Sequence, residues 1–256
     1  MRGLRLFFTF HVSRTMNRRV EPELLDELAA SDPRAIRSRR DLRRVNAWMG
    51  NPRIMASALS SAFKDRPPEL LVELGAGDGT FLLRVAQRLS PAFRSTTAVL
   101  VDRRDVVSPI TRRGFEELGW RTEIVAADVF DWFRESAAQA PDAVIANLFL
   151  HHFSNERLSD LLAQAARKTR VVVAIEPRRW AGSLAFGRLL WVIGCSQVTR
   201  HDARVSIRAG FAEKELSRLW PAESGWSLLE RAANFSSHLF VAERGSGSAS
   251  SSSSSS

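Results

Sequence analysis

The stretch LLVELGAGDGTFLLRVAQRL, residues 70–89, joins an apolar run to an amphipathic segment through three glycines in five residues. Glycine-rich turns between a strand and a helix commonly bind phosphate through backbone N–H groups in a positive field. This turn has the spacing G-x-G-x-G, with Thr80 where the dinucleotide-binding pattern has its third glycine, and no lysine follows Gly79. Glu73 and Asp78 would repel a pyrophosphate. The acids instead favour a ligand with hydroxyl groups and a cationic amine.

Apolar runs and helical stretches alternate along the chain after this turn. The expected strands cover 69–74, 97–102, 121–126, 142–147 and 170–175. Helical stretches are expected near 80–89, 107–118, 129–139 and 154–167. Strict alternation of this kind predicts an α/β fold with a parallel, doubly wound sheet. Two later strand-like runs, 226–232 and 237–243, are close enough to form a terminal hairpin.

The segment before the sheet contains a helix with both ends marked. Asp32 is the expected N-cap, Pro33 suits the first turn, and Gly50 suits the end. One face of this helix collects the residues Ala35, Ser38, Leu42, Val45 and Met49. The rest is covered by Arg37, Arg39, Arg40, Arg43 and Arg44. Two interpretations follow: a solvated helix docked by one stripe, or a lid whose arginines meet an anionic substrate or surface.

The expected domain organisation has four parts. Residues 1–19 form a disordered or non-native arm, with Met16 as an alternative start, and residues 20–66 form a helical lid. The main domain covers 67–243, with a helical insertion at about 178–225 that could roof the site. Its most apolar segment, 184–198, contains Arg188 and is too short to span a bilayer. Residues 244–256 form a disordered, serine-rich tail.

Composition limits the partners of the chain. Its 256 residues are 45% hydrophobic and 25% charged, as in a globular protein with a sizeable core. The net charge of +9 suggests nucleic acid or a membrane surface. Because arginine is simply the usual cation here and lysine is scarce, we expect nucleic-acid binding to be the minor alternative. The single cysteine, Cys195, excludes an internal disulfide and suits a cytoplasmic protein, and we expect no metal.

Acidic residues also follow the next two expected strands. In an open parallel sheet, ligands bind beyond the carboxyl ends of the strands. Asp102 ends the second strand, where it is placed to accept hydrogen bonds from both hydroxyls of a ribose. Asp128 follows the third strand and could meet an adenine edge, or equally cap the helix that begins after it.

At this point residues 70–176 resemble the class I S-adenosylmethionine-dependent methyltransferases. The resemblance lies in VELGAGDGTF, in VLVD, in AADVF and in ANLFLHHF, of which the last is most similar to the ubiquinone/menaquinone-type enzymes. It implies a Rossmann-like fold with an antiparallel last strand, and S-adenosylmethionine as the cofactor. It also implies that Gly75, Ala76 and Gly77 approach the amino-acid part of the cofactor, in a loop organised by Glu73. Asn147 and Leu148 would flank the methionine portion.

Methyl transfer is an in-line displacement, in which an enzyme mainly supplies alignment. A base is needed only when the acceptor must lose a proton. His151 and His152 follow the fourth strand, near the expected methyl group, and one of them could deprotonate a phenol or an enol. The alternative is that both pack against or cap the following helix.

The acceptor is expected to be a small, apolar or aromatic metabolite. The Pro-Pro segment of DNA amino-methyltransferases is absent after Asn147, and Cys195 lies too far along the chain for a cytosine-C5 nucleophile. The helical regions 33–63 and 180–220 would form its pocket, with Trp48, Arg178, Trp191 and Arg208 as the predicted binding residues. Two alternatives remain: methylation of RNA or protein through the arginine-rich helix 33–49, and a binding module without catalysis.

Overall fold

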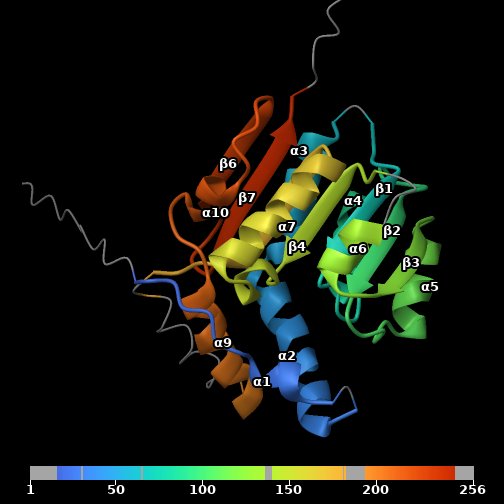
Figure 1. Cartoon of the computed structure of the whole chain (residues 1–256). Coiled ribbons are helices and arrows are strands. Elements are labelled where there is room, and N and C mark those ends of the chain that lie inside the picture. Colours follow the sequence, from blue (N-terminus) through green and yellow to red (C-terminus); the bar gives the residue numbers. More distant parts are fainter. Residues whose placement is uncertain are drawn as a thin grey trace, which may run out of the picture.

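The computed structural model describes residues 16–29, 31–64, 66–135, 140–180, 182 and 194–245. They form a seven-stranded sheet with the order β3-β2-β1-β4-β5-β7-β6. The strands are β1 (Leu70–Leu74), β2 (Thr97–Asp102), β3 (Arg121–Ala126), β4 (Ala143–Asn147), β5 (Val171–Pro177), β6 (Trp226–Ala232) and β7 (Ser237–Arg244). Strands β1 to β5 are parallel, and β7 runs antiparallel between β5 and β6 (Figure 1). The predicted doubly wound sheet with its antiparallel last strand is confirmed.

Helices cover both faces of the sheet. They are α1 (Leu24–Glu27), α2 (Pro33–Met49), α3 (Asn51–Ala62), α4 (Thr80–Leu89), α5 (Pro109–Glu117), α6 (Val129–Glu135), η1 (Leu150–His152), α7 (Asn155–Lys168), α9 (Gln197–Ala209) and α10 (Glu215–Leu219). One core packs α3, α4 and α5 against the sheet, and a second core packs α6, α7 and α10 against the other side. Strands buried on both faces read as continuous apolar runs, which is why the alternation was visible in the sequence.

Helix α2 begins and ends where its capping residues predict. The side chain of Asp32 accepts a hydrogen bond from the backbone N–H of Arg34, and Gly50 ends the helix with φ of 72°. The predicted apolar stripe needs one correction: Leu42 is only half-buried, and Asp41 is buried instead. Asp41 is tolerated there because it accepts hydrogen bonds from the backbone N–H of Ser196 and the hydroxyl of Thr199.

Residues 16–29, here called the N-terminal strap, lie with α2 and α9 beyond the carboxyl ends of the parallel strands (Figure 1). Arg18 fixes the strap by donating hydrogen bonds to Ala209 O, Phe153 O and the side chain of Asn155, each at 2.8 Å. Helix α3, by contrast, packs into the core through Met55 and Leu59. Of the predicted lid, therefore, the strap and α2 remain over the site.

Parts of the predicted organisation fall outside the described residues. These are most of the N-terminal arm, the serine-rich tail beyond residue 245, and residues 183–193 of the insertion. In the described part of the chain, no helix combines the length and the apolar character needed to cross a membrane.

Candidate functional site

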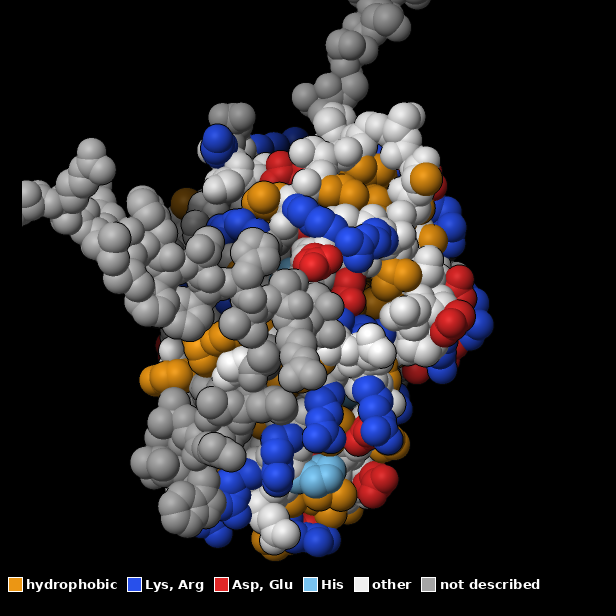
Figure 2. Space-filling view, turned by 90° about the vertical axis from the view of Figure 1, so that its left-hand side faces the viewer, with side chains coloured by type: hydrophobic (Ala, Val, Ile, Leu, Met, Phe, Trp, Pro, Cys, Tyr) orange, Lys and Arg blue, Asp and Glu red, His pale blue; other side chains and the backbone are white. Residues whose placement is uncertain are grey.

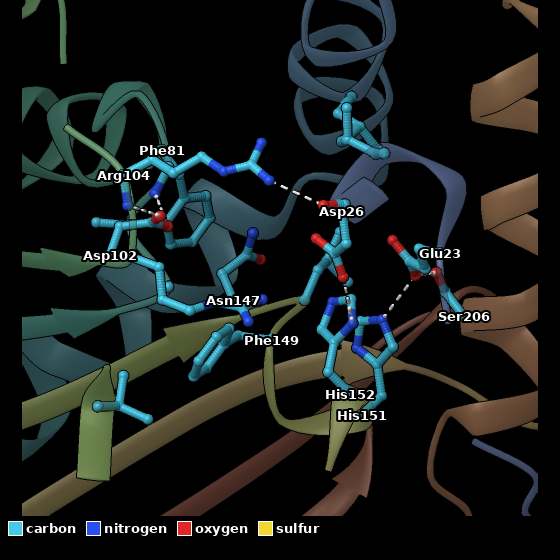
Figure 3. A pocket seen from close by; sticks show the side chains of 18 of the residues that line it. Glu23, Asp26, Phe81, Asp102, Arg104, Asn147, Phe149, His151, His152 and Ser206 are labelled. Carbon is cyan, nitrogen blue, oxygen red and sulfur yellow. Dashed lines mark hydrogen bonds and ion pairs between the residues drawn. The ribbon is translucent and has the colours of Figure 1, made fainter. Parts of the chain in front are cut away.

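A cavity of about 620 Å³ opens beyond the carboxyl ends of β1, β2 and β4. It lies at the point where the strand order reverses, between β1 and β4, which is where open α/β sheets bind ligands. Its lining includes every residue predicted for the cofactor: Glu73, Gly75, Ala76, Gly77, Asp78, Asp102, Asp128, Asn147 and Leu148. Figure 3 shows side chains from several of the surrounding elements directed into this space.

The glycine turn leaves room for a ligand at one position only. Gly75 and Gly77 both have positive φ, 68° and 54°. A Cβ added to Gly75 would lie 2.1 Å from Cδ2 of Phe149, whereas a Cβ added to Gly77 would meet no atom within 4 Å. Gly75 therefore permits close packing within the protein, and Gly77 leaves backbone open to the cavity.

Asp102 is held in place by backbone groups. Its Oδ2 accepts a hydrogen bond from Gly77 N at 2.9 Å, and its Oδ1 accepts one from Arg104 N at 3.0 Å. A carboxylate can accept about four hydrogen bonds, so both oxygens keep capacity for a pair of hydroxyls. Asp128 accepts from Phe130 N at 2.9 Å at the start of α6 and also lines the cavity, so its two predicted roles are compatible.

Glu73 has the burial and the unused hydrogen-bonding capacity expected of a carboxylate that binds a cation. Its side chain is 2% exposed, and among the described residues nothing hydrogen-bonds to its Oε2. Burial and the charges of Asp78 and Asp102 raise the pKa of Glu73 well above its usual value. A sulfonium or ammonium group in the cavity would offset both effects, so the acids fit S-adenosylmethionine.

Helix α2 is tied directly to the cofactor side of the cavity. Arg43 Nη1 lies 2.6 Å from Oδ2 of Asp78 in the glycine turn. Asn147, at the end of β4, donates a hydrogen bond to Asn46 Oδ1 at 3.2 Å. The next residue, Leu148, has φ of 52°, a strained conformation for a branched side chain. The backbone conformation between β4 and η1 is therefore stabilised by tertiary contacts and not by the local preference of Leu148.

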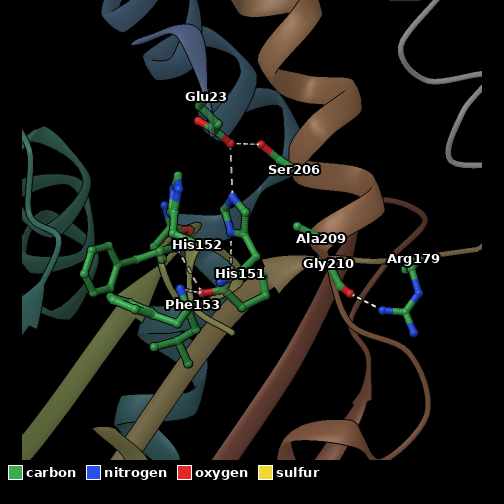
Figure 4. Close-up of polar contacts among 12 residues, drawn as sticks. Glu23, His151, His152, Phe153, Arg179, Ser206, Ala209 and Gly210 are labelled. Carbon is green, nitrogen blue, oxygen red and sulfur yellow. Dashed lines mark hydrogen bonds and ion pairs between the residues drawn. The ribbon is translucent and has the colours of Figure 1, made fainter. Parts of the chain in front are cut away.

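The two histidines of η1 occupy different environments (Figure 4). His151 is buried, with Nδ1 2.7 Å from Glu176 Oε2 and Nε2 3.3 Å from Glu23 Oε1. His152 is 25% exposed and lines the cavity, with its Nδ1 3.6 Å from Asp26 Oδ2. The imidazole rings lie close together, with centroids 4.3 Å apart and planes tilted by 31°.

These environments shift the two pKa values in opposite directions. Burial alone would lower the pKa of His151, but the hydrogen bonds to Glu176 and Glu23 and their charges raise it to about 9. For His152, burial and the neighbouring charge of His151 lower the pKa. His151 is accordingly a cation at neutral pH, and His152 is a neutral imidazole that faces the cavity.

Glu176, at the end of β5, organises η1. Its Oε1 accepts hydrogen bonds from Phe149 N and Leu150 N, and its Oε2 accepts from the backbone N–H of His151. The carboxylate therefore fixes both the backbone of this short helix and one histidine ring. Glu23, which faces the other nitrogen of the His151 ring, comes from the strap. It accepts a further hydrogen bond from Ser206 of α9.

Glu23, His151 and His152 offer atoms within 4.8 Å of one another, a spacing that a metal ion could join. Both nitrogens of His151 already face carboxylates, however. The rings are tilted by 31°, and an ion would compete with the carboxylate contacts of His151.

The predicted acceptor residues do not meet at the cavity. Trp48 is 60% exposed on α2, and Arg208 is exposed on α9. Arg178 donates a hydrogen bond to Asn234 O and lies over the ring of Trp180. None of the three lines the cavity, and Trp191 is outside the described residues. Residue type alone predicted these side chains as acceptor contacts. In the structure, the orientation of α2 and α9 directs other residues of these helices toward the cavity.

Several residues on the side of the cavity that faces the glycine turn were not predicted from the sequence. Glu23 and Asp26 come from the strap, Asn46 from α2 and Ser206 from α9. The strap contains only one helical turn and no periodic pattern. The signal that could have pointed to it is the pair of acids in PELLDEL, just before a well-capped helix.

Comparisons with known proteins agree with this geometry. Residues 71–171 match the family model described as a methyltransferase domain. The match covers less than half of the chain and agrees with the predicted methyltransferase class over this span. No curated protein sequence is significantly similar to the chain.

Among solved structures, the chain is similar to the plantazolicin methyltransferase BpumL in complex with SAH, with 14% identity and a TM-score of 0.59 over 84% of this chain and 91% of that one. An O-methyltransferase family protein from Burkholderia thailandensis has 20% identity and a TM-score of 0.54, over 85% and 62%. The mitomycin 7-O-methyltransferase MmcR has 16% identity and a TM-score of 0.55, over 86% and 60%. At these identities the likeness establishes the shared fold.

Proposed function

We propose that the chain transfers the methyl group of S-adenosylmethionine to an acidic hydroxyl, such as a phenol or an enol, of a small apolar or aromatic metabolite. The observation that carries this proposal is His152, a neutral and partly exposed imidazole on the cavity wall. It follows Asn147 and Leu148, which we assign to the methionine side of the cofactor. A neutral histidine at that place suits an acceptor that must lose a proton.

Each wall of the cavity has a role in this reaction. S-adenosylmethionine supplies an electrophilic methyl group on sulfur. We assign Asp102 to the ribose, Asp128 to the adenine, and Glu73 with the glycine turn to the amino-acid end. The strap and α2 cover the opposite side, and Phe149 and Phe153 add aromatic surface to the lining. Such walls exclude water and hold an acceptor in line with the methyl group.

His152 receives the proton of the acceptor, and its neighbours keep it ready. The carboxylate of Asp26, 3.6 Å from Nδ1, stabilises the imidazolium that forms. The cation of His151 acts in the opposite sense and keeps His152 neutral before the reaction. His151 itself is a positioning residue, because both of its nitrogens are engaged by Glu176 and Glu23.

A small acceptor is favoured over RNA by the distribution of charge. Figure 2 shows Lys and Arg side chains at several places on one face, with acidic and hydrophobic side chains between them. Nucleic-acid sites instead gather cations into a stripe along the phosphates. The similar folds point the same way, since the names of BpumL and MmcR refer to the small molecules plantazolicin and mitomycin. The segment ANLFLHHF favours the ubiquinone/menaquinone type, and we place the reaction in the cytoplasm.

Calorimetry with S-adenosylhomocysteine tests the cofactor assignment. We expect wild-type protein to bind it and Asp102→Ala to bind at least about 10-fold more weakly, because two hydrogen bonds to a carboxylate are lost. Arg112→Met, at a partly exposed residue whose ion-pair partner in the described part of the chain is Asp105, is the matched control and should bind normally. Absence of binding by wild type would overturn the proposed function, and normal binding by Asp102→Ala would overturn the ribose assignment.

A further inference from the structure

We propose that Arg104 is a positioning residue that makes the acceptor site depend on the bound cofactor. The backbone of Arg104 holds the ribose carboxylate, and its side chain holds the strap that brings Asp26 beside His152 (Figure 3). This inference rests on the proposed function. It adds a connection between the two halves of the cavity, and with it a coupling between cofactor binding and the docked strap.

The cofactor end of the connection is the turn after β2. Arg104 N donates to Oδ1 of Asp102, whose Oδ2 accepts from Gly77 in the glycine turn. Arg103, Arg104 and Val106 also line the cavity, so the whole turn borders the space assigned to adenosine. A nucleoside bound to Asp102 therefore restricts the backbone that carries the Arg104 side chain.

The other end lies on the strap. The guanidinium of Arg104 donates from Nη1 to Leu28 O and from Nη2 to Asp26 O, both at 2.8 Å. It thereby holds the C-terminal end of α1, a helix of four residues that has no side-chain cap. A single turn of helix is not stable alone, so its position depends on such contacts.

The strap has a second point of attachment close by. The backbone N–H groups of Leu24 and Leu25 donate to the carboxylate of Asp202 on α9, at 2.9 and 3.0 Å. These contacts belong to the acceptor side and do not touch the cofactor turn. Arg104 is thus the described side chain that joins α1 to the turn of Asp102.

Such a link has a defined thermodynamic consequence. If the cofactor favours the docked strap, the docked strap favours the cofactor by the same factor. Two hydrogen bonds from a charged donor correspond to a coupling of roughly 5- to 30-fold. The bound cofactor and the docked strap therefore stabilise each other, and the acceptor chamber is most complete when the methyl donor is present.

Hydrogen–deuterium exchange tests this coupling, with the amides of Leu24 and Leu25 as reporters. We expect saturating S-adenosylhomocysteine to slow their exchange in wild type by roughly 5- to 30-fold. Arg104→Met should lose most of this slowing while it still binds the ligand, because the backbone N–H that holds Asp102 remains. Arg104→Lys, with one shorter cationic donor, should recover part of it, and Arg112→Met should behave as wild type.

The outcomes separate this proposal from the proposed function. If wild type does not bind S-adenosylhomocysteine in calorimetry, the proposed function fails and the coupling fails with it. If the ligand binds but the strap amides do not respond, or respond equally in Arg104→Met, the coupling alone is overturned.

Nuclear magnetic resonance of His152 gives a second readout that a merely structural role would not move. The charged groups near His152 are His151, Glu23, Asp26 and Glu176. In wild type, the ligand should raise the pKa of His152, because the docked strap holds the carboxylate of Asp26 beside it. Arg104→Met should show no such rise on binding, and an equal rise would contradict the role of Arg104.

Discussion

Two adjacent histidines differ in charge environment because their neighbours differ. His151 points between Glu176 and Glu23, which hold its charge inside the protein. His152 points into the cavity, where that charge keeps it neutral. The sequence HH cannot show this division, since it depends on a glutamate more than a hundred positions away in the strap. Opposed pKa shifts in a contacting pair are a common way to assign acid–base roles.

Replacement of His152 tests its role as the base. We expect His152→Ala to lower kcat by roughly 10²- to 10⁴-fold with phenolic acceptors, and to leave the affinity for S-adenosylhomocysteine nearly unchanged. Because the pKa of His152 is lowered, the wild-type rate should fall only below the usual titration range of histidine and stay level above it. Release of S-adenosylhomocysteine across the pH range measures both effects. An unchanged rate in His152→Ala would leave alignment as the whole mechanism.

The charge on His151 predicts a pH dependence of stability. Its folded pKa of about 9 lies above the ordinary histidine value of 6.5, so folding favours the protonated form. The stabilisation is complete below about pH 6.5 and is lost as the pH rises through about 9, and it amounts to roughly 3 kcal/mol. Denaturant titrations from pH 6 to 10 should show this loss in wild type and not in His151→Gln. A parallel loss in the variant would assign the effect to other groups.

At the scale of elements, the turn between β1 and α4 combines two requirements in five residues. Its first glycine must let the ring of Phe149 lie against the backbone. Its second must leave the backbone open to the ligand and still donate to Asp102. The spacing of the glycines in the sequence does not distinguish these two roles. The free space around each Cα in the structure does distinguish them.

Alanine substitutions at the two glycines should therefore have different effects. Gly75→Ala places a methyl group against Phe149 at positive φ and should destabilise the protein by roughly 2–4 kcal/mol. Gly77→Ala meets no neighbour and should cost only about 1–2 kcal/mol in stability. It should nevertheless weaken S-adenosylhomocysteine binding at least about 10-fold, because its methyl group enters the cavity. Thermal unfolding and calorimetry distinguish the two, and equal stability losses would contradict this assignment.

Elements with strong local signals were predictable from the sequence. The strands β2, β3 and β6 have the predicted bounds, and α2 begins and ends at its capping residues. Local backbone preferences and apolar periodicity determine such bounds. The burial of Asp41 in place of Leu42 on α2 was not predictable. It depends on hydrogen-bond donors at the start of α9, which approach Asp41 only in the folded protein.

At the scale of the whole molecule, the same distinction separates the two sides of the cavity. The side proposed for the cofactor comes from one span of chain, residues 73–148, in which Glu73, Asp102 and Asn147 lie at the carboxyl ends of strands. Parallel topology brings such positions together, so their residues could be identified in advance. The opposite side joins Glu23 of the strap, Asn46 of α2 and Ser206 of α9, whose packing is set by tertiary contacts. Trp48, Arg178 and Arg208 were chosen without knowledge of those contacts.

The arrangement of the strap and α9 has a consequence for diversification. Both lie outside the span that lines the cofactor side, one before it and one after it, and they meet through Glu23, Ser206 and Asp202. During evolution, the strap and α9 could therefore be replaced together while the central span stayed unchanged. Recombination at the borders of the central span offers a route to chimaeras that keep one methyl donor and acquire new acceptors. Exchange of a single end would instead leave a buried carboxylate without its partner.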